Sequence, residues 1–345
     1  MSNSSGGFLE AILAFIKALF GGSASQQPPG SSEPTPVPPS TPEPAVLVSP
    51  RVLLIVYDPI VDPATGMKLT QRMGWKRPED LTSGFISDIL ETSGGLGRYQ
   101  IVQRIEVNEF PVKVDGFRYT AQAYLDVMNG KTQPHNPDMV NYQDFLNRFN
   151  ILQRVAANEI DEVWAFAFPY AGFYESTMGG YGAFFCNSGP LMGTSKCPRR
   201  FVVMGFSYER GVGEMLEAFN HRVESTLEKV YSSSRGGANL WKKFAQFDKS
   251  LPGQAEVGTV HYAPNGERDY DWGNTRYVPS RCDDWYNFPN FQGVSKQVNC
   301  AEWGGGDIRA YHKWWLKHLP KVSGRTNGIA NNWWQYILDL NRVLV

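Results

Sequence analysis

Three runs of apolar residues recur along the chain, and each has the length of a strand. They cover residues 52–57 (VLLIVY), 161–168 (DEVWAFAF) and 201–206 (FVVMGF). Runs that are apolar at nearly every position are typical of strands covered on both faces, as in parallel sheets. Residues 99–107 differ, because Ile101, Ile105 and Val107 alternate with polar residues. That alternation predicts a further strand with one buried face.

Between these strands the apolar residues recur every three or four positions, as they do on one face of a helix. This spacing predicts four helices, at residues 80–90, 120–128, 142–158 and 212–231. The first is expected to begin at Asp80 or Thr82 and to end before Gly94. Strands that alternate with helices predict an α/β fold, with a mostly parallel or mixed central sheet and flanking helices.

The pattern changes beyond Gly258, where loops dominate and tryptophan is concentrated. Seven of the ten tryptophans lie from Trp272 onward, and two pairs of them fall in stretches with helical spacing. We therefore expect residues 51–345 to form a single α/β domain, with a loop-rich, tryptophan-rich C-terminal portion from about residue 258.

The first 50 residues do not have the pattern of a folded domain. Residues 8–20 (FLEAILAFIKALF) are apolar except for Glu10 and Lys17, and they are too short to span a bilayer, which takes about 20 apolar residues. We expect residues 1–25 to be a degenerate export signal or an amphipathic anchor with at most peripheral membrane contact. Nine prolines from Pro28 to Pro50 predict an extended linker over residues 26–50.

Charge and aromatic content narrow the class of partner. Lys and Arg number 33 against 34 Asp and Glu, a net charge of −1, so the chain offers no basic field to a nucleic acid. Aromatic residues make up 13% of the chain, and we expect some rings to line a cleft as well as to fill the core. A polysaccharide or a peptide is the substrate class that such a cleft favours.

The four cysteines form two local pairs, Cys186 with Cys197 and Cys282 with Cys300, and each pair brackets an irregular loop. A cross-link across such a loop restricts the unfolded chain, so we expect two disulfides, with free thiols as the alternative. No Cys-x-x-Cys spacing points to zinc. Disulfides imply an oxidising compartment, so the protein is expected to be secreted or on the cell surface.

The predicted helix at residues 212–231 has two distinct faces. One is an apolar stripe formed by Val212, Met215, Leu216, Phe219, Val223, Leu227 and Val230. The other carries Glu214, Glu217, His221, Glu224 and Glu228. The apolar stripe must pack on the sheet. Two interpretations of the acidic face stay open at this point: it is exposed to solvent, or it borders a cleft.

Glu217 and His221 are four residues apart, so both side chains can reach one metal ion. The residues around them, MLEAFNHR, resemble the zinc-binding helix of the zincin metalloproteases, whose pattern is His-Glu-x-x-His. The resemblance places Glu217 and His221 at the two ligand positions. Ala218 stands where zincins have their general-base glutamate, which implies either a lost peptidase activity or a different chemistry. Glu214 or Glu224, one turn away, is a candidate replacement base.

A third ligand must come from elsewhere in the chain, and His261 is the candidate. The loop that it opens is rich in oxygen donors: Asn265, Glu267, Asp269, Asp271 and Asn274. These donors allow calcium in place of zinc, although the spacing matches no EF-hand loop and a plain turn is the alternative. His312 and His318 are expected to be structural, and His135 to lie in a loop.

Two further carboxylates offer a site that needs no metal. Glu175 follows the predicted strand at residues 161–168, and Glu209 follows the one at residues 201–206. Ligand sites of parallel α/β folds gather at the carboxyl ends of strands, so the pair is a candidate for the two acids of a glycosidase. The alternative is a turn cap for Glu175 and a surface ion pair for Glu209.

These observations give three hypotheses. The first is a secreted, hydrolase-like protein with a cleft over the Glu214, Glu217, His221 and Glu224 face. The second is a carbohydrate-active enzyme that uses Glu175 and Glu209. The third is a non-catalytic module that binds glycans at a cell surface. In its proline-rich linker, its FYES and NHRVES segments and its tryptophan-rich end, the chain also resembles a group of uncharacterised secreted bacterial proteins. That resemblance implies export and no particular activity.

Overall fold

A computed structural model describes residues 45–344. The predicted signal or anchor at residues 1–25, and the linker up to residue 44, lie outside the described residues. The core is a five-stranded sheet in the order β4-β1-β5-β7-β6. Its strands are β1 (Arg51–Tyr57), β4 (Gln100–Val107), β5 (Glu162–Ala167), β6 (Ser176–Gly179) and β7 (Phe201–Ser207). The first four in that order run parallel and β6 is antiparallel to β7, so the predicted α/β fold with a mixed sheet is confirmed.

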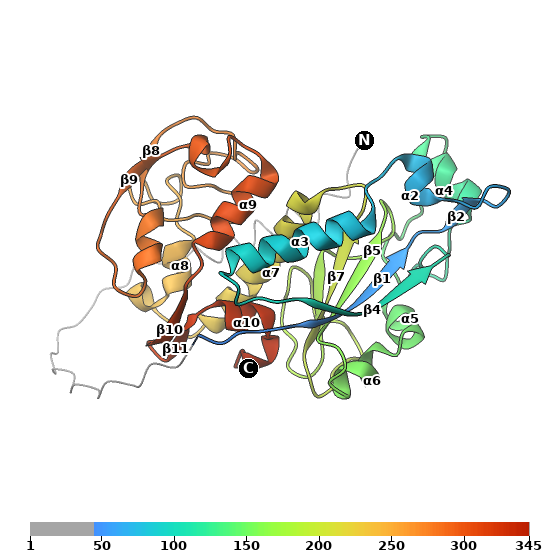
Figure 1. Cartoon of the computed structure of the whole chain (residues 1–345), viewed down its shortest axis with the longest axis horizontal. Coiled ribbons are helices and arrows are strands. Elements are labelled where there is room, and N and C mark those ends of the chain that lie inside the picture. Colours follow the sequence, from blue (N-terminus) through green and yellow to red (C-terminus); the bar gives the residue numbers. More distant parts are fainter. Residues whose placement is uncertain (1–44, 345) are drawn as a thin grey trace.

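Helices flank this sheet (Figure 1). The two longest, α3 (Pro78–Thr92) and α7 (Val212–Val230), pack against each other, and Phe85 of α3 joins them to the sheet. The Phe85 ring lies 5.2 Å from that of Trp164 and 5.8 Å from that of Phe219. The smaller elements near the first strands are β2 (Ile60–Asp62), β3 (Met67–Lys68), α2 (Leu69–Met73) and α4 (Ala121–Met128).

The predicted helix at residues 142–158 is wrong as a single element. The structure has two short helices there, α5 (Tyr142–Arg148) and α6 (Ile151–Ala156). Asn150, between them, has a φ of 50°, in the left-handed region that a continuous helix cannot contain. The apolar spacing continues across the break because both helices bury their apolar residues in the same core.

The C-terminal portion forms a lobe beside α7 (Figure 1). Its elements are α8 (Leu240–Phe244), β8 (Val278–Ser280), β9 (Lys296–Val298), α9 (Ile308–Lys317), β10 (Lys321–Thr326), β11 (Ile329–Asn332) and α10 (Trp334–Leu338). Most of the tryptophans fill its interior, and Trp241, Trp285, Trp303, Trp315, Trp333 and Trp334 are fully buried. These rings join the sheet in one continuous apolar core. The tryptophans therefore stabilise the lobe and leave the exposed aromatic positions mostly to tyrosines.

All four cysteines are buried free thiols, so neither expected disulfide is formed. Cys186 lies beside the Ser176 hydroxyl at the start of β6, with its sulfur 3.3 Å away. The backbone of Cys197 pairs instead with Tyr181, beyond the other end of β6. A four-residue strand spans about 13 Å, whereas the Cα atoms of a disulfide lie about 4.4–6.8 Å apart.

The second pair is separated in a similar way. Val278 pairs with Val298 and Ser280 pairs with Lys296, so the β8–β9 ladder is antiparallel. Cys282 lies beyond one end of this ladder and Cys300 beyond the other. Without disulfides, the prediction of an extracytoplasmic location rests on the first 50 residues and on the resemblance to secreted bacterial proteins. Within residues 45–344, no helix combines the length and the apolar character that a membrane crossing needs.

Candidate metal centre and the adjoining pocket

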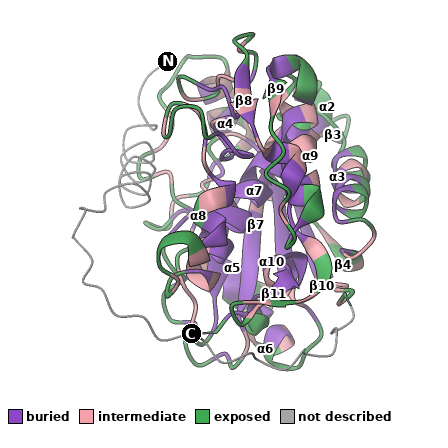
Figure 2. Ribbon diagram, turned by 90° about the vertical axis from the view of Figure 1, so that its left-hand side faces the viewer, coloured by how far each residue is buried: buried purple, intermediate pink, exposed green. Residues whose placement is uncertain are grey.

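Helix α7 is buried along both of its faces, and it appears purple at the centre of Figure 2. Glu217 is 8% exposed, His221 7% and Glu224 8%, so their side of the helix does not face solvent. Contacts with α9 cover the helix, and the segment around His261 lies against the same side. The acidic face therefore looks into the molecule. Glu214 and Glu228, at the two ends of the face, are half-buried.

The side chains of Glu217, His221 and His261 converge on one point. The Nε2 atoms of the two histidines are 3.0 Å apart, and Glu217 Oε1 lies 3.3 Å from Nε2 of His261. One ligand atom from each of the three residues lies within 4.8 Å of the others. We call these three residues the triad. The structure thus brings together the three residues that the sequence nominates as metal ligands.

Each histidine of the triad is also held from behind by a carboxylate. His221 Nδ1 is hydrogen-bonded to Glu224 Oε2 at 3.2 Å, and His261 Nδ1 lies 3.1 Å from Asp269 Oδ1. A carboxylate at Nδ1 keeps the proton on that nitrogen and turns the Nε2 lone pair the other way, toward the shared point. The other Glu224 oxygen accepts a hydrogen bond from the Val260 backbone at 3.0 Å, which ties the helix to the segment that carries His261.

A tight turn places His261 over the helix. Gly258 has a φ of 89°, and a Cβ atom there would lie 2.2 Å from the Tyr262 carbonyl oxygen, so only glycine fits. Three aromatic side chains donate hydrogen bonds to the carbonyls of this turn: Trp315 to Gly258 (3.1 Å), Tyr311 to Thr259 (2.5 Å) and Trp272 to Val260 (3.1 Å). The tryptophan-rich lobe therefore fixes the position of His261.

The charges around the triad favour a cation. Three carboxylates, those of Glu217, Glu224 and Asp269, surround two imidazoles. Burial lowers the pKa of His261, but its contacts with Asp269 and Glu217 outweigh this and raise that pKa to about 9. The nearby His312 behaves in the opposite way, because burial and the neighbouring histidines hold its pKa well below the usual value. Positive charge is therefore stabilised at His261 and disfavoured at the neighbouring His312. A divalent ion at the triad would compete with the proton on His261.

A pocket of about 360 Å³ opens at the carboxyl ends of β5 and β7 and reaches α7 at Ala218, the residue after Glu217. Glu175 and Glu209 both line it, so the structure brings the two predicted strand-end acids to one cavity. Glu175 accepts a hydrogen bond from the Asn187 side chain at 2.8 Å, and Glu209 is exposed. Glu214 and Ala218, from the first turns of α7, complete this part of the wall.

Tyr270 packs against the triad. Its ring centroid is 4.3 Å from that of His261, and its backbone has a φ of 60°, which is uncommon outside glycine. Burial raises the pKa of the Tyr270 phenol, and the charges of Glu217 and Glu175 raise it further. The Tyr270 phenol is therefore influenced by one carboxylate of the triad, Glu217, and by one that lines the pocket, Glu175.

The two acids proposed as replacement bases have other partners. Both oxygens of Glu224 are hydrogen-bonded, one to His221 and one to Val260, so Glu224 positions the ligands. Glu214 Oε2 accepts from the Gly211 backbone at 2.9 Å and caps the start of α7. Both oxygens of Glu224 are thus engaged, whereas Glu214 uses one oxygen for the cap and also lines the pocket.

The oxygen-rich loop after His261 is mostly occupied by its own turns. Asn265 donates to the carbonyls of Asn274 and Arg276, and Asp271 accepts from the Asn274 side chain. These bonds are those of the plain turn that the sequence offered as the alternative to calcium. Asp269 is the exception, because its carboxylate points to His261. Sequence reasoning named Asp269 only as a calcium donor and did not single out Tyr270 or Asn187. The one signal for Asp269 was an acid a few residues after a candidate ligand.

A second group with metal-ligand chemistry lies in the C-terminal lobe. It consists of Cys282, Asp283 and His318, with ligand atoms within 4.8 Å of one another. Lys296 places its ammonium 2.8 Å from Asp283, and this positive charge opposes a bound cation. Burial raises the pKa of the Cys282 thiol to about 12, which disfavours the thiolate that a metal needs. The triad is the better metal centre of the two.

Comparison with protein-family models, with curated proteins and with solved structures found no match to the chain. The functional argument therefore depends on the residues and their geometry, and the zincin resemblance stays a prediction.

Proposed function

We propose that the protein is a metal-dependent hydrolase whose divalent ion is held by Glu217, His221 and His261. Two imidazoles and one carboxylate form a ligand set of catalytic zinc sites, whereas structural zinc sites have four protein ligands. Nitrogen donors favour zinc or a similar transition metal over calcium. An ion with three protein ligands keeps a position open for water or substrate and acts there as a Lewis acid.

One observation supports this proposal above all others. The Nε2 atoms of His221 and His261 both face Glu217, while each Nδ1 faces a second carboxylate. This arrangement of carboxylate, histidine and metal position recurs at zinc sites, because the outer carboxylate orients the ring and raises its basicity. A cluster with a purely structural role would not need a carboxylate at Nδ1 of both imidazole rings.

Glu175 is the residue that we assign as general base. The zincin resemblance leaves the base position to Ala218, whose methyl group can take no proton. Ala218 lines the same pocket as Glu175, so a carboxylate from the segment after β5 lies at the cavity that a zincin glutamate would enter. The amide of Asn187 orients Glu175 in that cavity. A Glu175→Gln variant should retain the metal and lose about 10²–10⁴-fold in kcat.

The experiment that tests the hydrolase uses 4-nitrophenyl esters, phosphates and glycosides and a fluorescent casein as probes. The protein is assayed as purified, after chelation, and after zinc is returned. Glu217→Gln should abolish zinc-dependent turnover, whereas the matched variant Glu228→Gln, three turns further along the same helix, should retain it. Hydrolysis that survives both chelation and the Glu217→Gln change would contradict the proposal.

A second candidate function is a glycosidase that uses Glu175 and Glu209. It is favoured by the single pocket that both acids line, with the half-exposed Tyr170 beside them to stack on a sugar ring. This enzyme would cleave 4-nitrophenyl glycosides in the presence of a chelator and would lose activity in Glu209→Gln as well as in Glu175→Gln. The metal hydrolase requires only Glu175 of the two. Glycan binding that persists in both variants, without turnover, would favour the binding module.

A further inference from the structure

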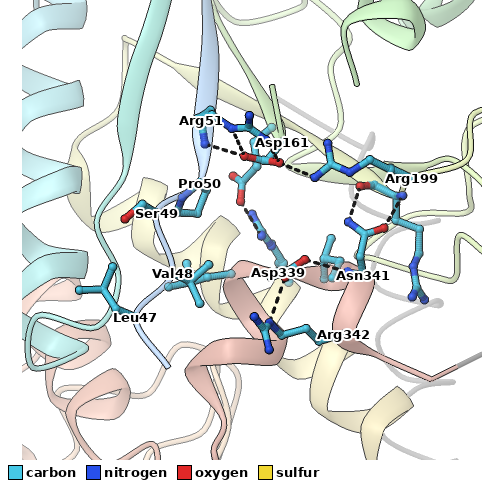
Figure 3. Close-up of a pocket in the computed structure, with 15 residues that line it drawn as sticks. Leu47, Val48, Ser49, Pro50, Arg51, Asp161, Arg199, Asp339, Asn341 and Arg342 are labelled. Atoms are coloured by element: carbon cyan, nitrogen blue, oxygen red, sulfur yellow. Dashed lines mark hydrogen bonds and ion pairs between the residues drawn. The ribbon is translucent and has the colours of Figure 1, made fainter. Parts of the chain in front are cut away.

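A second pocket lies at the opposite end of the sheet, near the amino ends of β1, β5 and β7 (Figure 3). Its volume is about 310 Å³, which is enough for a small molecule. The wall includes residues 47–51 before and at the start of β1, residues 161–162 and 199–200, Arg222 of α7, and residues 338–342 near the end of the chain. No residue of the triad or of the first pocket takes part.

The charge in this pocket is positive. Five arginines line it, Arg51, Arg199, Arg200, Arg222 and Arg342, against the three acids Asp161, Glu162 and Asp339. Asp161 is shared, because Arg51 and Arg199 approach it at 2.8 Å and 2.6 Å, as Figure 3 shows. Within residues 45–344, Arg200 forms no ion pair with any carboxylate, and its guanidinium Nη2 donates to the Val343 carbonyl at 2.6 Å.

Some buried guanidinium nitrogens in this wall have no acceptor among residues 45–344. Arg200 is 6% exposed, and within residues 45–344 its Nη1 has no hydrogen-bond partner. Arg222 is 1% exposed, and its Nε and Nη1 have no partner there either. The remaining Arg222 nitrogen donates to Glu162 and to the Ile337 carbonyl. A buried donor without an acceptor costs about 1–3 kcal/mol, and more when it is charged. An acceptor placed in the pocket would recover that energy.

We propose that this pocket binds a small oxyanion, with Arg200 as its principal ligand. Guanidinium groups bind phosphate and carboxylate oxygens through paired, charge-assisted hydrogen bonds, and a ligand with several oxygens can satisfy donors on more than one arginine. The positive balance of the wall favours an anion, and the partial pairing by Asp161, Glu162 and Asp339 keeps the arginines in place when the pocket is empty. The inference does not depend on the hydrolase, because no residue is shared between the two sites.

The test is a calorimetric titration of the full chain with inorganic phosphate and, separately, with succinate, at an ionic strength held constant with sodium chloride. We expect one site per chain for at least one of the two anions. The anion that binds more tightly identifies the ligand as phosphate-like or carboxylate-like. Arg200→Gln should weaken binding at least tenfold, whereas Arg77→Gln, which removes the same charge from the other end of the sheet, should leave it unchanged.

Arg342→Gln provides a second variant, because Arg342 is partly exposed at the rim of the pocket and its loss should disturb the fold little. It should weaken binding by a smaller factor than Arg200→Gln. The proposal is overturned if neither anion binds at millimolar concentration. It is equally overturned if Arg200→Gln, Arg342→Gln and Arg77→Gln all bind the anion as the unaltered protein does.

Discussion

At the scale of single residues, the proposed metal centre depends on which partner each of the two nitrogens of His221 and His261 faces. His221 gives Nδ1 to Glu224 and His261 gives Nδ1 to Asp269, which leaves both Nε2 atoms for the triad. Glu224 has the more exacting role, because its two oxygens accept from two different donors. A side chain with only one acceptor oxygen cannot satisfy both.

Glu224→Gln should therefore weaken metal binding about 10–100-fold without changing the stoichiometry. The glutamine amide presents its NH₂ group either to His221 or to the Val260 backbone, and each choice sets a donor against a donor. Competition with a chromogenic zinc chelator measures the affinity. Glu228→Gln is the matched control and should bind zinc as the unaltered protein does. Equal affinities in the two variants would remove the positioning role of Glu224.

At the residue scale, the sequence predicted more of the site than at the larger scales. The spacing of Glu217 and His221 is local and is visible in one helical turn. Asp269 could not be assigned to His261 in the same way, because their contact depends on how the loop closes. The burial of the acidic face was undecided as well, since the residues that cover it follow α7 at a distance along the chain.

At the scale of elements, the ends of α3 and α9 are joined by one lysine. Lys321, at the start of β10, donates to the Thr92 carbonyl at 3.1 Å and to the Lys317 carbonyl at 2.7 Å, and so caps both helices. Burial, with the positive charge of Lys317, lowers the pKa of Lys321 from an ordinary value of 10.5 to about 8. The native state therefore loses this proton more readily than the unfolded chain does.

Between about pH 8 and pH 10.5 the unfolded chain binds more protons at Lys321 than the native protein, so the contribution of this group to stability rises with pH. We expect the free energy of unfolding of the unaltered protein, relative to Lys321→Met, to increase by on the order of 1 kcal/mol from pH 8 to pH 10. Urea unfolding at several pH values measures it. Lys131→Met, which removes an exposed lysine, should show no such trend relative to the unaltered protein. A difference that falls with pH would contradict the lowered pKa.

The elements themselves were predicted where their signal is local. The strands β1, β4, β5 and β7 and the helices α3, α4 and α7 lie where apolar patterning places them. The edge strand β6 was missed, because its four residues, Ser176–Gly179, form a strand only through pairing with β7. The break at Asn150 was missed because the apolar spacing continues through it.

At the scale of the whole molecule, the C-terminal lobe completes the site that the α/β sheet begins. Helix α7, which packs on the sheet, supplies Glu217 and His221, and the lobe supplies His261 and Asp269. The contacting residues of the lobe and of α7 are far apart along the chain, so neither the hydrophobic pattern nor the composition predicted their contact. The lobe also holds its turn over α7 through Trp272, Tyr311 and Trp315, so two of its tryptophans position His261 while the others fill the core.

A metal held by both parts should stabilise the molecule against unfolding. An ion that binds the native state alone adds about 4 kcal/mol when its concentration is 1,000 times the Kd. Zinc should therefore raise the Tm by several degrees, and chelation should reverse the change. Differential scanning calorimetry measures the shift. His221→Ala should unfold at the same temperature with and without zinc, and a zinc-dependent shift retained in that variant would place the ion elsewhere.

The most direct measurement of the central claim is the X-ray absorption spectrum of the protein loaded with one equivalent of zinc. The triad predicts a first shell of nitrogen and oxygen only, at about 2.0–2.2 Å, with the outer scattering of two imidazoles. A sulfur neighbour at about 2.3 Å would place the ion at Cys282 instead and contradict the assignment to Glu217, His221 and His261.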